Sequence, residues 1–132
     1  MVDFKYNAFN SLYGDYMADD DKAIIRSLRR SKVRVVILLF IAQNYYGQAN
    51  LKQLRKGLNI CASNLLGALI GVQGRYSYQD SLVGLGLLER VETSIEGHKM
   101  IHYRITEKGL RIARMLQNEP TTAAIRGELK AY

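Results

Sequence analysis

Apolar residues recur three and four positions apart in five stretches of the chain, a spacing that predicts five helices. The first is expected to begin at Asp19 to Asp21, because carboxylates favour the amino end of a helix. The second follows Ser31 and contains Val33 to Ala42, the most hydrophobic segment. Such an apolar run is too short for a membrane span, so this segment is predicted to be the central helix of the core.

The third and fourth helices are predicted within residues 50–71, on either side of a tight turn. Asn50 is expected to cap the third helix, Gly57 to end it, and Cys61 to Ser63 to open the fourth. The apolar face of the fourth helix is predicted to contain Leu65, Leu66, Leu69 and Ile70. Its opposite face is predicted to contain small and polar residues, namely Ser63, Asn64, Gly67, Ala68 and Gly71. Complementary apolar faces favour a helix-turn-helix, although two core helices of an ordinary bundle show the same pattern.

Two runs of β-forming residues around Gly97, LLERVETSI and MIHYRI, predict a hairpin over residues 87–105. Its tip is expected to carry Gly97, His98 and Lys99. The alternating apolar positions are expected to form one buried face with Val91, Ile101, Tyr103 and Ile105. Thr106 then caps the last predicted helix, which runs to residue 119.

These elements predict a mainly α fold with a small β-hairpin (α+β): a winged helix-turn-helix with an N-terminal arm and an additional C-terminal helix. We expect the arm to occupy residues 1–20, the domain residues 21–119 and a tail residues 120–132. The arm is rich in aromatic residues, so it is expected to pack either on its own domain or on a second copy.

The chain has 132 residues, of which 48% are hydrophobic, and a formal net charge of +7. Residues 1–21 hold one Lys and five Asp, a net −4, which leaves +11 for residues 22–132. A basic balance favours nucleic acid, but it also suits an acidic partner or solubility alone. Six cations without an acid are either a phosphate-contacting patch or a solvated face: Lys22, Arg26, Arg29, Arg30, Lys32 and Arg34.

The single cysteine, Cys61, excludes an internal disulfide and a cysteine-based zinc cluster. We expect it to be a buried small hydrophobe in a reducing, cytoplasmic protein.

Residues 31–118 resemble the archaeal winged-helix transcriptional regulators. The resemblance is carried by SKVRVVILLFIA, LKQLRKGLNI and SNLLGALIG, the lead-in SLVGLGLLERVE and the phrase HYRITEKG. It implies a DNA-binding homodimer whose second helix of the helix-turn-helix enters the major groove, with the hairpin as a wing against the minor groove or backbone. The VQGRYSYQD segment between them is longer than in the family's simplest members.

The resemblance places the recognition positions at Ala62, Ser63, Asn64, Gly67 and Ala68. Asn64 is the best candidate for a base contact, because an Asn side chain can bond adenine at two atoms. Candidate contacts to the DNA backbone are Lys52, Arg55, Lys56, Arg75, Tyr76, Lys99 and Arg104. Candidates for the dimer interface are Phe4, Phe9, Tyr13, Ile112, Met115 and Leu116.

An enzyme is disfavoured, because the sequence has no Walker-type phosphate loop, no G-x-S-x-G motif and no usable Cys/His pair. His98 and His102 are not expected to form a metal site, and the sequence identifies no cofactor and no effector pocket. The alternative function is a winged-helix module for protein–protein contacts in transcription or replication. Basic residues that converge around Asn64 would favour DNA, whereas scattered ones would favour a protein partner.

Overall fold

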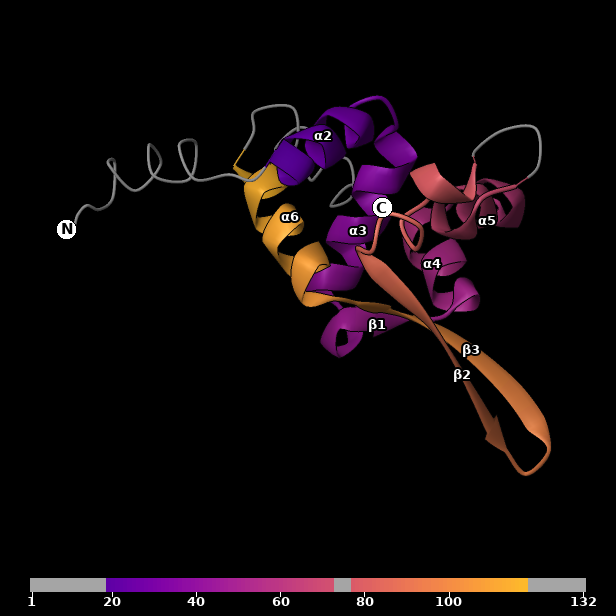
Figure 1. The fold of residues 1–132 in the computed structure, drawn as a ribbon. Helices are drawn as coiled ribbons and strands as arrows, with labels where there is room; N and C mark the ends of the chain where they lie inside the picture. Colours follow the sequence, from indigo (N-terminus) through magenta and orange to yellow (C-terminus); the bar gives the residue numbers. More distant parts are fainter. Residues whose placement is uncertain (1–18, 73–76, 119–132) are drawn as a thin grey trace.

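Five α-helices and one three-stranded antiparallel sheet are found in residues 19–72 and 77–118, the parts of the chain that the computed structural model describes (Figure 1). The elements are α2 (Asp19–Leu28), α3 (Lys32–Gln43), the 3-10 turn η1 (Tyr45–Gly47), β1 (Gln48–Ala49), α4 (Leu51–Leu58), α5 (Ala62–Ile70), the 3-10 turn η2 (Tyr78–Asp80), β2 (Leu88–Ile95), β3 (His98–Ile105) and α6 (Glu107–Gln117). The predicted α+β class is confirmed. The arm was predicted to end at residue 20, but Asp19 and Asp20 belong to α2. The rest of the arm, with Phe4, Phe9 and Tyr13, and the predicted tail lie outside the described residues.

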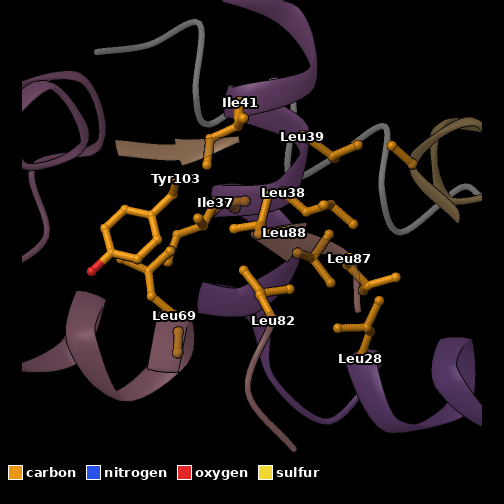
Figure 2. Packing of buried hydrophobic residues seen from close by; sticks show 14 of the residues in the cluster. Leu28, Ile37, Leu38, Leu39, Ile41, Leu69, Leu82, Leu87, Leu88 and Tyr103 are labelled. Carbon is orange, nitrogen blue, oxygen red and sulfur yellow. The ribbon is translucent and has the colours of Figure 1, made fainter. Parts of the chain in front are cut away.

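Helix α3 is the centre of the core, as its hydrophobicity predicted. Ser31 caps it by accepting a hydrogen bond from the backbone N–H of Arg34. The helix contacts α2, α4, α5, α6, β1 and β3. Ile37, Leu38 and Leu39 are fully buried, and burying each such side chain contributes ~1.5–3 kcal/mol. Figure 2 shows them among side chains of the surrounding elements, which include Leu28, Leu69, Leu82, Leu87, Leu88 and Tyr103.

The sheet has the strand order β1-β3-β2, and its β2–β3 hairpin projects away from the helices (Figure 1). Glu96 and Gly97 both have positive φ, 51° and 81°, as a two-residue type I′ turn requires. Tyr103, at the base of the hairpin, is buried in the core, and burial raises the pKa of its phenol. One expectation was wrong: Val91 pairs with His102 and therefore lies on the face opposite Tyr103.

Helices α2 and α6 are joined by two ion pairs. The carboxylate of Asp21 is only 4% exposed and accepts two hydrogen bonds from Arg111, at 2.9 and 3.1 Å. These bonds raise the pKa of the Arg111 guanidinium. Lys108 lies 2.9 Å from Asp20. The acidic start of α2, predicted from helix electrostatics alone, therefore also attaches this helix to α6.

Arg34 is buried, so it belongs neither to a phosphate-contacting patch nor to a solvated face, whereas the other five cations of residues 22–34 are exposed. Its guanidinium donates to the hydroxyl and carbonyl oxygens of Ser27 and to the carbonyl oxygen of Asp80. The segment after Asp80 in turn holds the end of α5, because the N–H groups of residues 82 and 83 donate to the carbonyl oxygens of residues 68 and 69. Arg34 thus links α2 and α3 to the segment that fixes α5.

Helix α6 uses its apolar side for the core of its own chain. Ile112 is 0% exposed and Leu116 is 1% exposed, and α6 contacts α3. Neither side chain is available to a second copy, so their prediction as dimer contacts is wrong. These two residues are apolar because they contact the core of their own chain. Met115 is half-buried and remains a candidate.

Candidate nucleic-acid interface

Helix α4 begins as predicted and ends later than predicted. The Asn50 side chain accepts the backbone N–H of Gln53 at 2.8 Å, and the Gln53 side chain accepts that of Asn50 at 2.9 Å. Gly57 does not end the helix: it lies within it, where a Cβ atom would collide with the ring of Phe40. Asn59 takes the left-handed conformation that ends the helix, with φ of 55°. Gly57 is therefore a packing position against α3.

Three exposed cations of α4, Lys52, Arg55 and Lys56, line a hollow of ≈ 620 Å³ between the end of α4 and the start of α5. We call these three residues the α4 cations. Asn59, Ile60 and Cys61 complete the lining. Within the described part of the chain, none of the α4 cations takes part in an ion pair or a side-chain hydrogen bond. Among the residues that the structure describes, no acid therefore neutralises the three positive charges of the hollow.

The amino end of α5 opens at the same hollow. Cys61 is the N-cap residue, and its carbonyl oxygen accepts the first helical hydrogen bond, from the N–H of Leu65. The N–H groups of the first turn and the helix dipole add partial positive charge there. Helix dipole and α4 cations thus both favour an anion at this place.

Cys61 is exposed, which corrects the expectation of a buried residue. Its Sγ lies 3.4 Å from the hydroxyl oxygen of Ser63. The hydrogen bond to this hydroxyl lowers the pKa of the thiol most, and a weaker contribution in the same direction comes from a hydrogen bond to the backbone of Asn64. The burial expectation failed because the residue caps a helix at an open hollow, whereas free cysteines are more often part of a core.

The outward face of α5 differs from the predicted one. Gly67 and Ala68, predicted to contact bases, are buried, and α5 contacts α3. Ser63 is exposed and Asn64 is half-buried. Leu66 and Ile70, predicted to be core residues, are half-buried instead. Base contacts through Gly67 and Ala68 are therefore excluded in this conformation, while those of Ser63 and Asn64 stay predictions.

The cations of the β2–β3 hairpin are neutralised within the hairpin. Lys99 lies 2.8 Å from Glu92, and Arg104 lies 3.5 Å from Glu89. The hydrogen bond from Lys99 lowers the pKa of Glu92 and keeps this carboxylate charged. Residues 88–105 contain three Lys or Arg and three Glu, a net charge of zero. Lys99 and Arg104 are thus weaker candidates for phosphate contacts than the α4 cations.

The turn of the hairpin consists of Glu96 and Gly97, and β3 begins directly after it, so His98 and Lys99, which were predicted at the tip, are the first two residues of this strand. Beside it, Ile95 is 57% exposed and Met100 is 40% exposed. The other predicted backbone contacts, Arg75 and Tyr76, fall outside the described residues.

Charge is distributed unevenly along the chain. The 58 residues between Asp21 and Asp80 contain ten Lys or Arg and no Asp or Glu. The acid-free stretch therefore extends far beyond the six cations of residues 22–34. A second hollow, of ≈ 810 Å³ between η1 and α6, contains one cation, Arg104, which is paired with Glu89. The hollow at the α4 cations is therefore the better site for a polyanion.

No helix in residues 19–72 and 77–118 combines the length and the apolar character needed to cross a bilayer. Comparison with known proteins places the chain in a family. The model of the EarA-like family matches residues 24–116, and the chain belongs to this family. The chain is also similar to an uncharacterized protein of Methanocaldococcus jannaschii, with 37% identity over 99 residues that cover 75% of this chain and 86% of the relative. No solved structure matches.

Proposed function

We propose that this protein is a winged helix-turn-helix protein that binds double-stranded DNA sequence-specifically and acts as a dimeric transcriptional regulator. Helices α4 and α5 are its helix-turn-helix, and the β2–β3 hairpin is its wing. The order α3, β1, α4, α5, β2, β3, with β1 paired to β3, supports this assignment.

The observation that carries the proposal is the convergence of the α4 cations on the amino end of α5. DNA presents a regular array of phosphates, and cations that contact them displace condensed counterions. A helix amino terminus beside these cations is a second feature that binds phosphate. With a phosphate in the hollow, the first turns of α5 are the part of this helix nearest to the bases, as in other helix-turn-helix proteins.

The test is a salt series of fluorescence anisotropy with mixed-sequence duplex DNA. One variant replaces the three α4 cations by Ala. A charge-matched control replaces three exposed cations by Ala: Lys22 and Arg26 of α2, and Arg30 in the turn that follows it. Because each phosphate contact contributes a slope of about 0.9 to log Kd against log salt, the first variant should flatten the slope by about 2.7. Between 50 and 200 mM salt it should therefore lose about 40-fold less affinity than the parent.

Two results would contradict the proposal. If both triple variants flatten the slope equally, net charge rather than the hollow determines binding. If the folded parent does not bind at low salt, the protein is not a DNA-binding protein.

A protein-interaction module is the second candidate, and one observation favours it. The hairpin is electrically neutral and exposes Ile95 and Met100, as a surface for a protein partner would. Absence of DNA binding, together with loss of a partner from an Ile95→Asp/Met100→Asp variant, would support this function instead.

A further inference from the structure

The outward face of α5 consists mainly of methyl-bearing side chains. Ala62, Leu66 and Ile70 are half-buried, and Ser63 is the exposed polar residue among them. Beyond the helix, the apolar side chain of Val72 is 38% exposed. Spacings of three and four residues place Leu66 and Ile70 on the same side of the helix as Ser63. A helix with this face has little means of distinguishing bases by hydrogen bonds.

This apolar face is continuous with the hollow of the α4 cations. Cys61 lines the hollow, and Ala62 is the first residue of the helix. The acid-free stretch described above includes both helices, so no carboxylate on α4 or α5 repels a polyanion. Charge complementarity therefore favours DNA as the occupant of this face over a protein surface that has no excess of negative charge.

One apolar feature distinguishes base pairs in the major groove, the C5-methyl group of thymine. Ala and other apolar side chains contact this group in known complexes. Since N-terminal residues of a recognition helix lie closest to the base edges, Ala62 and Leu66 are the side chains best placed for such contacts.

We infer that α5 selects its DNA target by packing Ala62 and Leu66 against thymine methyl groups. This inference rests on the proposed DNA binding. Ser63 supplies a hydrogen bond beside the methyl contacts, and the α4 cations fix the helix on the backbone. Each half-site contains at least one thymine that is selected for its methyl group.

The test begins with selection of duplexes from a randomised pool by the full-length protein. Each selected thymine is then replaced singly by deoxyuridine, which lacks only the methyl group. Transfer of one methyl-sized group is worth ~0.8 kcal/mol, so Kd should rise about fourfold for each contacted thymine. In Leu66→Ala, replacement of the thymine that Leu66 contacts should no longer change Kd. Leu110→Ala, which truncates a half-buried Leu side chain of α6, should keep the full effect.

The outcomes separate this inference from the proposed function. Specific binding without any effect of deoxyuridine would overturn the thymine contact and leave DNA binding intact. Salt-dependent binding that selects no sequence would overturn both the thymine contact and the sequence specificity of the proposed function, and would leave DNA binding itself intact. Failure of the folded parent to bind any duplex at low salt would overturn both. If circular dichroism shows that Leu66→Ala is unfolded, Leu66→Met replaces it, because Met is an apolar side chain of similar volume. This variant should still bind the duplex, but the thymine at which deoxyuridine raises Kd should change.

Discussion

Iodoacetate offers a way to place one negative charge beside the α4 cations without a mutation. The Cys61 thiolate displaces iodide and becomes a thioether that carries a carboxylate. Cys61 is the single cysteine of the chain, so the product is modified at one thiol. Because hydrogen bonding to Ser63 lowers the pKa of the thiol, the thiolate forms at lower pH than in an ordinary cysteine. Modification at neutral pH should therefore be faster in the folded than in the urea-unfolded protein.

The carboxylate should offset one of the three positive charges of the hollow and cancel one phosphate contact. One contact corresponds to a slope of about 0.9 against log salt, which we take to vanish at 1 M. DNA binding should then weaken about 15-fold at 50 mM salt and only about fourfold at 200 mM.

The assay is anisotropy with the same duplex at both salt concentrations, after mass spectrometry has shown a single adduct. The matched control is the iodoacetamide adduct, which is nearly identical in size but neutral, and should bind almost as the parent does. Equal weakening by both adducts at both salts would show that bulk, not charge, matters at Cys61. No weakening by either adduct would show that the hollow does not lie against DNA, and would refute the reasoning.

Two further predictions concern stability. A Cβ at Gly109 would collide with the backbone carbonyl oxygen of Leu87. Gly109→Ala should thus lower the free energy of unfolding, measured in urea, by about 1–3 kcal/mol. In the control Gly57→Ala, the new Cβ meets only the movable ring of Phe40, so the loss of stability should be smaller. If both cost the same, the backbone contact has no special effect. Asp21→Asn keeps the size of a buried side chain but loses its charge-assisted bonds to Arg111. Because the Arg111 side chain is 48% exposed and can be hydrated again, we expect the free energy of unfolding to fall by about 1 kcal/mol. An unchanged thermal midpoint would show that the pair contributes nothing.

Helix starts were predictable because capping depends on neighbours in sequence. Asn50, Ser31 and Thr106 each accept an N–H three residues ahead, and this local bond is what the sequence pattern records. The end of α4 was not predictable, because Gly57 is a glycine for a different reason: it packs against Phe40, a residue distant in sequence.

The orientation of α5 could not be predicted from its nine residues. Leu, Ile, Ala and Gly occur around most of the helix, so the apolar period is weak, and packing against α3 decides the buried side. Small residues such as Ala68 were assigned to the outside although their size suits them for close packing. The sequence therefore predicted the two helices that form the candidate site, but it assigned two base contacts to buried positions.

The neutrality of the hairpin also required the structure. Glu89 and Arg104 are fifteen positions apart in sequence, and only the strand register shows that they are directly opposite. Similarly, nothing in the sequence indicated that Arg34 would be buried while its neighbours Lys32 and Arg30 stay exposed.

The charges of the β2–β3 hairpin neutralise one another through ion pairs within the hairpin. Its cations are already neutralised by Glu89 and Glu92, so bringing the hairpin to a polyanion would displace few salt ions from solution. The attraction of the α4 cations, in contrast, comes largely from such displacement and fades as salt rises. Any affinity that the hairpin adds should therefore persist in concentrated salt. In a plot of log Kd against log salt, the steep slope then measures the contribution of the α4 cations, and the binding that remains at high salt measures that of the hairpin.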